Sequence, residues 1–205
     1  AGGARVLTLT GPGGMGKTRL ALQAAADLIE NFRHGVFFVD LSPLDDSALV
    51  PARIAQALRL QESGPHPLLE QLKEFLCQKQ ILLVLDNFEQ VLEAALQVVD
   101  LLASCPNVRF LVTSREALRV QGEKVFLVPP LSLPEARVGP TLSSSALGQY
   151  EAVRLFIERA VAVKPDFQVT NANAPAVAEI CVRLEGIPLA IELASARVRL
   201  LPPEL

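Results

Sequence analysis

A glycine-rich loop between an apolar run and an alanine-rich run is the feature that most constrains this chain. The loop, GPGGMGKT at residues 11–18, matches the pattern G-x-x-x-x-G-K-[ST] at every fixed position. Glycine tolerates positive φ and leaves room for the backbone to approach a ligand. We expect a strand at Val6–Thr10 before the loop and a helix at Thr18–Ile29 after it. The N–H groups and dipole at the start of that helix favour a bound anion, so the loop predicts a phosphate site.

The loop residues have distinct expected parts in holding phosphate. Backbone N–H groups from about Gly13 to Thr18 point inward, Lys17 reaches the β- and γ-phosphates, and the Thr18 hydroxyl coordinates Mg²⁺. An ordinary glycine-rich turn is the alternative. The residues expected to contact the nucleotide here are Gly11, Pro12, Gly13, Gly14, Met15, Gly16, Lys17, Thr18 and Arg19.

Apolar strands alternate with helices over the first 130 residues. Further strands are predicted at Gly35–Leu41, Ile81–Asp86, Val108–Arg115 and Lys124–Val128, and further helices at Ala48–Leu60, after Pro67 and after Asp86. This alternation predicts an α/β fold, with a mostly parallel sheet covered by helices on both faces. Right-handed crossovers then place the carboxyl ends of the strands at one edge, where ligands bind in such folds.

Two of these helices have a predicted inner face. In the helix after the glycine loop, the inward residues are Leu20, Ala21, Ala24, Ala25 and Leu28. In a single helix after Asp86, they are Val91, Leu92, Ala95, Val98, Val99 and Leu102.

Two acidic residues near the end of an apolar strand are candidates for catalysis and metal binding. Asp86 ends the strand ILLVLD, where a buried carboxylate is costly unless other groups compensate its charge. Beside the glycine loop it would hold Mg²⁺ through water, whereas the alternative is a cap on the next helix. Glu89 follows one turn later and either orients a water or is a solvated helix residue.

A basic residue ends another strand at the same edge. Arg115 closes the segment LVTSR, and a guanidinium suits the γ-phosphate because it binds oxygens in pairs. Such a contact would distinguish ATP from ADP. The alternative is a surface ion pair with Glu116 or Glu123. Asp40 is interpreted as a cap or loop acid, and Arg197 with Arg199 as a solvated helix face.

The composition changes after Pro129. Residues 131–149 are rich in proline, serine and glycine and predict a linker. Only helices are predicted beyond it, at Tyr150–Val163, in a segment capped by Asn173 and running to Leu184, and from Pro188 onward. We therefore expect an α/β domain at residues 1–130, a linker at 131–149 and a small helical domain at 150–205.

Composition excludes several classes of function. The net charge of −3 over 205 residues argues against direct binding of nucleic acid by this segment. No apolar run reaches the roughly 20 residues of a membrane span, and no signal peptide is visible, so a cytoplasmic location is expected. Cys77, Cys105 and Cys181 are interpreted as buried reduced thiols, and His34 and His66 as surface or loop residues. The two ends of the chain predict a piece of a longer protein.

Six segments together resemble the STAND class of signal-transduction NTPases, close to NB-ARC domains and large LuxR-type or AfsR-like bacterial regulators. They occur in the family's order and span nearly the whole chain. The segments are LTGPGGMGKTRLA, FFVDLSPLDD, ILLVLDNFEQV, LVTSRE, EAVRLFIERA and EICVRLEGIPLAIELASARVRLL.

The resemblance implies a P-loop NTPase core with strand order 5-1-4-3-2, followed by a small helical domain. It implies Walker A, Walker B and sensor roles for Lys17 with Thr18, Asp86 and Arg115. The family's Gly-x-Pro motif falls on Gly186 and Pro188, and it implies that Pro188 packs near adenine, with Leu189 lining the same pocket.

The sequence departs from the family pattern at two places. Many relatives have a second acid directly after the Walker B aspartate, but this chain has Asn87, and an amide cannot accept a proton. Hydrolysis is then slow or relies on Glu89. A segment that precedes the first strand in the family is absent from this sequence.

The resemblance implies an ATP/ADP-binding regulatory switch with slow, Mg²⁺-dependent ATP hydrolysis. Its expected partners are adenine nucleotide, winged-helix, repeat or DNA-binding output domains of a longer chain, and other copies in an ATP-dependent homo-oligomer. The alternatives are a module that binds nucleotide without hydrolysis and, from another class, a small-molecule kinase or housekeeping ATPase. The kinase is disfavoured because the linker offers only Arg137 for a catalytic lid.

Overall fold

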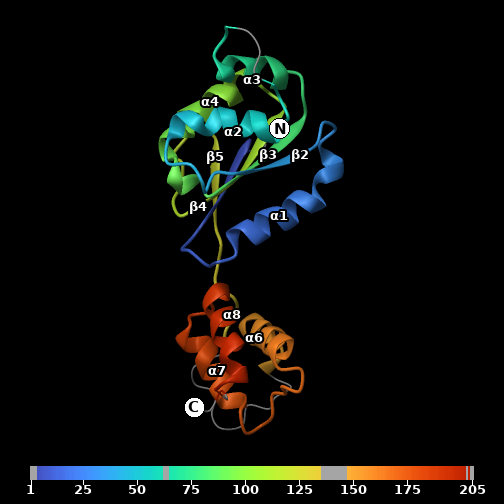
Figure 1. Cartoon of the computed structure of the whole chain (residues 1–205), viewed down its shortest axis with the longest axis vertical. Coiled ribbons are helices and arrows are strands. Elements are labelled where there is room, and N and C mark those ends of the chain that lie inside the picture. The colour runs from blue at the N-terminus through green and yellow to red at the C-terminus, as the bar shows by residue number, and fades with distance from the viewer. Residues whose placement is uncertain (1–3, 62–64, 135–146, 202, 204–205) are drawn as a thin grey trace. The chain divides into compact units, whose positions relative to one another are not determined.

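The computed structural model describes residues 4–61, 65–134, 147–201 and 203 of the 205-residue chain. The chain divides into two units, one of residues 1–12 with 17–128 and the other of residues 13–16 with 129–205. A sheet with helices makes up the first unit, and the labelled elements of the second are all helices (Figure 1). Most of the predicted linker, residues 135–146, lies outside the described residues.

Five parallel strands form the sheet of the first unit, in the spatial order β2-β3-β4-β1-β5. This is the predicted order 5-1-4-3-2 counted from the opposite edge, so the prediction is confirmed. The strands are β1 (Val6–Thr10), β2 (Val36–Asp40), β3 (Ile81–Asp86), β4 (Val108–Ser114) and β5 (Glu123–Leu127).

Helices cover both faces of this sheet (Figure 1). The α-helices are α1 (Lys17–Asp27), α2 (Val50–Ala57), α3 (Leu68–Leu76) and α4 (Ala95–Ser104). Short 3₁₀ turns are η1 (Ile29–Asn31), η2 (Ser47–Leu49), η3 (Phe88–Gln90) and η4 (Leu92–Ala94). The side chains of Ile81, Leu83 and Leu85 share a buried core with α2, α3 and α4. Because strand side chains alternate, Leu82 and Val84 point to the other face, where α1 contacts β3 and β4.

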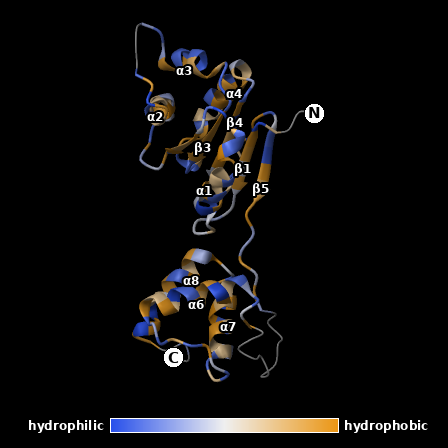
Figure 2. Cartoon of the chain, turned by 90° about the vertical axis from the view of Figure 1, so that its right-hand side faces the viewer, coloured by the Kyte–Doolittle hydropathy of each residue, from blue (hydrophilic) through white to orange (hydrophobic). Residues whose placement is uncertain are grey.

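The central strand β3 is buried at all six positions. A strand covered on both faces loses its polar alternation, which is why the run ILLVLD is apolar until its final residue. Hydrophobic colour accordingly fills the central strands in Figure 2. The polar residues that end β3 and β4 therefore lie together at one edge of the sheet, directly after the buried apolar runs.

The second unit is a small helical bundle. Its helices are α6 (Glu151–Val163), α7 (Ala174–Arg183) and α8 (Pro188–Ser195), followed by the 3₁₀ turn η5 (Ala196–Arg199). Phe156 of α6 lies in its core and packs against Phe167, with 6.2 Å between ring centroids. Among the described residues, no helix combines the length and apolarity needed to cross a membrane.

Two predictions about the helices were wrong. The single helix expected after Asp86 is broken into η3, η4 and α4, because Asn87 has φ 61° and Val91 has φ −136° and ψ 42°. The inner face of the helix after the glycine loop is narrower than expected, since Ala21 and Ala25 are buried while Leu20 is exposed, and the exposed Leu28 lies beyond the end of α1. Small alanines let α1 pack closely on the sheet, so the flanking leucines stay outside.

Two smaller expectations also need correction. Asn173 is the residue before α7, but its side chain does not cap the helix: its Oδ1 accepts from Thr170 N–H at 2.8 Å, and its Nδ2 donates to Gln168 O. The three cysteines are free thiols, but Cys77 is partly exposed, unlike Cys105 and Cys181. Burial raises the pKa of Cys181 to about 12, so this thiol is held in its neutral form.

Candidate functional site

The glycine loop lies between β1 and α1, as the sequence predicted. Gly14 and Gly16 both have φ 80°, a conformation that strongly favours glycine. In the described part of the chain, no hydrogen bond is formed by the N–H groups of Gly13, Gly14 or Gly16. Unpaired N–H groups just before the start of a helix suit an anion. Of the other residues predicted to contact nucleotide, Met15 is buried, while Pro12 and, on α1, Arg19 are exposed.

Lys17, the first residue of α1, is held against the loop itself. Its Nζ donates to Gly11 O at 2.7 Å and to Pro12 O at 2.9 Å. Burial lowers the pKa of Lys17, and the negative charge of Glu89 acts in the opposite direction. The ammonium group therefore loses hydration in the folded chain, and a phosphate would offer it a stronger partner than two carbonyls.

Asp86 at the end of β3 is the most buried charged group of the site, with 4% of its surface exposed. Its Oδ1 accepts hydrogen bonds from the hydroxyls of Thr18, at 2.7 Å, and Thr113, at 2.5 Å. The structure thus brings Thr18 and Asp86 together, as the metal-site prediction requires. The residue that precedes the η3 turn is Asn87, so Asp86 does not occupy the cap position proposed as the alternative.

The oxygen atoms at this point fit Mg²⁺ bound together with phosphate. Mg²⁺ takes one or two carboxylates plus substrate phosphates and water, and it prefers hard oxygen donors such as Thr18 Oγ1 and Asp86. Asp86 Oδ2 has no hydrogen-bond partner among the described residues. Over the part of the chain that the structure describes, no cluster of three or more His, Cys, Asp or Glu could hold a metal ion.

Glu89 and Arg115 form an ion pair at the same edge of the sheet. Arg115 Nε lies 3.3 Å from Glu89 Oε1, and the Glu89 side chain is only 12% exposed. The other oxygen, Oε2, is buried without a hydrogen-bond partner. Glu89 is therefore not a solvated helix residue, and its charge is close enough to influence Lys17.

The two glutamates proposed as alternative partners of Arg115 bind elsewhere. Glu116 pairs with Arg119 at 3.6 Å. Glu123 accepts from the N–H groups of Leu118 and Arg119 and from the Thr8 hydroxyl, so it holds the chain between β4 and β5. Arg115 itself is 67% exposed, which leaves its guanidinium accessible from solvent.

Three further residues singled out by the sequence are Asp40, Arg197 and Arg199. Asp40 ends β2 and accepts from Ser42 N–H at 2.9 Å, as expected of an acid that caps a loop. Hydrogen bonding from the side chain and the backbone of Ser42 lowers the pKa of Asp40. Arg197 and Arg199 are exposed on η5, again as expected. Pro188 begins α8, and the next residue, Leu189, is half exposed and donates its N–H to Gly14 O of the glycine loop at 3.1 Å.

The local structure explains why residue 186 is a glycine. Gly186 has φ 69°, and a Cβ at this position would collide with the carbonyl oxygen of Leu131. The Leu131 N–H donates to Gly186 O at 3.0 Å, so the two segments are in close contact.

Sequence reasoning missed one member of the site, Thr113. Its hydroxyl contacts both Asp86 and the backbone of Asn87. The available signal was a polar residue inside the buried strand segment LVTS, where an unpaired hydroxyl would be costly.

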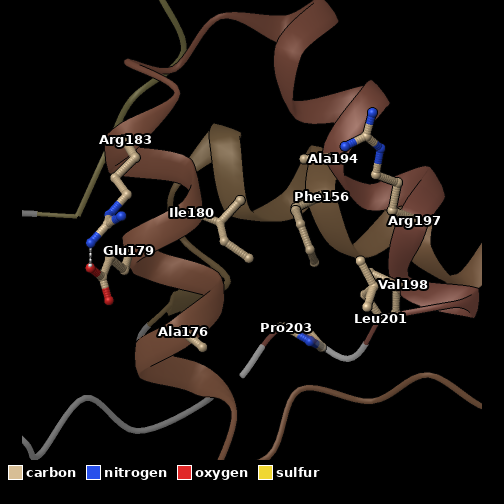
Figure 3. Close-up of a pocket in the computed structure, with 10 residues that line it drawn as sticks. All are labelled: Phe156, Ala176, Glu179, Ile180, Arg183, Ala194, Arg197, Val198, Leu201 and Pro203. Carbon is tan, nitrogen blue, oxygen red and sulfur yellow. Dashed lines mark hydrogen bonds and ion pairs between the residues drawn. The ribbon is translucent and has the colours of Figure 1, made fainter. Parts of the chain in front are cut away.

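A separate cavity of about 410 Å³ lies in the second unit (Figure 3). Its walls include Phe156, Ile180 and Val198, and Arg183 at its margin is ion-paired with Glu179 at 2.6 Å. None of the predicted site residues lines this cavity, so it does not bear on the phosphate site.

Comparisons with known proteins agree with this geometry. The family model described as an AAA domain matches residues 1–120. A Mycobacterium tuberculosis protein, named provisionally as an HTH-type transcriptional regulator, is 44% identical over 200 residues, which cover 97% of this chain and 21% of that protein. An uncharacterised protein of the same organism is 40% identical over 97% of this chain and 47% of its own length. The chain thus spans about a fifth of the length of the first relative.

Solved structures share the fold at low identity. The ORC2 protein of Aeropyrum pernix, described in ADPNP and ADP complexes, has a TM-score of 0.59 at 13% identity, covering 95% of this chain and 54% of its own. Cdc6p of Pyrobaculum aerophilum gives 0.60 at 14%, covering 95% and 55%. A signal transduction ATPase with numerous domains (STAND) and a tetratricopeptide repeat sensor, from Pyrococcus horikoshii, gives 0.51 at 15%, covering 92% and 27%.

Two neutral replacements of Asp86 test its role as an acceptor. Asp86→Asn keeps an oxygen that can accept from Thr18 and Thr113, whereas Asp86→Ala leaves both hydroxyls without it. We expect Asp86→Ala to be less stable than Asp86→Asn by about 1–3 kcal/mol in urea unfolding followed by circular dichroism. Equal stability of the two variants would show that the acceptor oxygen does not hold the hydroxyls.

Proposed function

Because this chain belongs to the AAA domain family, we propose that it is an ATP/ADP-binding regulatory switch module of a bacterial signal-transduction or transcriptional regulator, with slow Mg²⁺-dependent ATP hydrolysis. The loop at residues 11–18, the buried lysine and the Thr18–Asp86 pair support a P-loop NTPase site. The fold shared with a STAND protein and the name of the first relative support a regulatory role.

The proposal of a switch rests mainly on one observation, the ion pair between Arg115 and Glu89 near Lys17. Arg115 is ion-paired with Glu89 in the structure, and an arriving γ-phosphate would compete for the same guanidinium. A triphosphate would thereby release Glu89, whereas a diphosphate would leave the pair in place. Such differential contact is what a ligand needs in order to shift a conformational equilibrium.

Different residues would bind the phosphates and the metal ion. The N–H groups of residues 13–18 and the ammonium of Lys17 hold the phosphates, and Thr18 with Asp86 would hold Mg²⁺. When bound, Mg²⁺ neutralises charge on the phosphate oxygens. Glu89 is the acid available to orient a water, because Asn87 cannot accept a proton. The placement of adenine against Pro188 and Leu189 remains a prediction from the family resemblance.

Titration calorimetry with Mg-ADP, Mg-ATP and Mg-GTP tests nucleotide binding. We expect adenine-selective binding, with ADP tighter than ATP, and a loss of about tenfold or more in Lys17→Ala because the variant lacks the cation that contacts phosphate. Lys124→Ala, which removes an exposed lysine on β5, is the matched control and should bind normally. Equal affinity of Lys17→Ala and the unaltered chain would contradict the proposed site.

A module that binds nucleotide without hydrolysing it is the second candidate, and Asn87 is the observation that favours it. Phosphate release from Mg-ATP separates the two. If Glu89 orients the attacking water, we expect Glu89→Gln to slow release by about tenfold or more, with ADP affinity nearly unchanged. Absence of phosphate release from the unaltered chain would favour the binding-only module, whereas ADP formation without phosphate release that depends on an added acceptor would indicate a kinase.

A further inference from the structure

The hydroxyl of Thr113 joins two parts of the site that the proposed function uses separately. Thr113 lies on β4 with 1% of its surface exposed. Its Oγ1 donates to Asp86 Oδ1 at 2.5 Å and accepts from the Asn87 N–H at 3.0 Å. A threonine hydroxyl has one proton to donate, and here that proton is committed to the Asp86 carboxylate.

This bond fixes how Asp86 presents its oxygens. Oδ1 accepts hydrogen bonds from the hydroxyls of both Thr18 and Thr113, while Oδ2 has no hydrogen-bond partner among the described residues. Two donors on one oxygen hold the carboxylate in a single orientation. The other oxygen is thereby kept for a further ligand.

The same hydroxyl supports the turn that follows β3. Asn87 has φ 61° and ψ 41°, a left-handed conformation that costs a non-glycine residue about 1 kcal/mol or more. Its N–H group is held by Thr113, and the turn leads directly into η3, which carries Glu89. Release of this N–H would free both the turn and the position of Glu89.

We propose that Thr113 is a positioning residue for the magnesium–nucleotide site, acting through Asp86 and the Asn87 turn. This inference rests on the proposed function, because it concerns the metal-dependent part of nucleotide binding. Thr113 contacts no phosphate in this account. Its removal should therefore weaken the contribution of Mg²⁺ to binding and spare the contribution of the phosphate loop.

The chain contains a matched control for the loss of a buried hydroxyl. Thr8 on β1 is also fully buried, and its Oγ1 donates to a carboxylate, Glu123 Oε1, over the same distance of 2.5 Å. Glu123 holds the connection between β4 and β5 and is not among the site residues. Thr8→Val and Thr113→Val each remove one charge-assisted hydrogen bond, but only the second lies at Asp86.

The test is calorimetric titration of the whole chain with ADP, once with Mg²⁺ and once with EDTA. We expect Thr113→Val to weaken Mg-ADP binding by about tenfold, the usual effect of losing a hydrogen bond to a charged group, and to change metal-free ADP binding by less than about twofold. Thr113→Ser retains a hydroxyl and should recover Mg-ADP affinity to within about threefold. Thr8→Val should keep both affinities.

The outcomes separate the inference from the proposed function. Equal losses of metal-free and Mg-ADP affinity in Thr113→Val, or unchanged Mg-ADP affinity, would overturn the positioning role while leaving nucleotide binding intact. No ADP binding by the unaltered chain would overturn the proposed function and this inference with it. If Thr113→Val does not unfold cooperatively, Thr113→Cys takes its place, because a thiol is a weak donor and predicts the same selective loss of Mg-ADP affinity.

Discussion

The burial of the Asp86 carboxylate is the constraint on which the site depends. A charge with so little exposure at the end of an apolar strand must receive hydrogen bonds from its surroundings. The two hydroxyls that supply them come from Thr18 at the start of α1 and Thr113 on β4, so one side chain ties the phosphate loop to two neighbouring strands. The order β2-β3-β4-β1-β5 makes this possible, because β4 lies between the strands that carry Asp86 and the loop.

The remaining charges of the site follow a common pattern. Lys17 bonds to two loop carbonyls, and Arg115 bonds to Glu89. Each cation that the proposed function assigns to phosphate is therefore held by a partner of the same chain. An incoming triphosphate would exchange these internal contacts for stronger ones, which links its binding to the position of Glu89.

The sequence predicted the sheet well because a doubly covered parallel sheet requires continuous apolar runs, and β3 and β4 are such runs. It failed after Asp86, since hydrophobic spacing does not report the left-handed turn at Asn87. The glycine-loop motif and the acid at the end of an apolar strand likewise predicted that Lys17, Thr18 and Asp86 form one group, and the Thr18–Asp86 hydrogen bond agrees with that prediction. The partner of Arg115 and the role of Thr113 depend on how β3 and β4 are aligned side by side, and spacing along one strand cannot show that alignment.

Amide chemical shifts test the central claim, that the loop at residues 11–18 binds the phosphates of a nucleotide. In ¹H–¹⁵N correlation spectra recorded during titration with Mg-ADP, we predict the largest shifts at Gly13, Gly14, Gly16, Lys17 and Thr18, whose N–H groups would acquire phosphate acceptors. We predict a smaller shift for the Asn87 amide, because its N–H is hydrogen-bonded to Thr113 beside the site. Shifts confined to residues outside the loop, or no shifts at saturating Mg-ADP, would contradict the account.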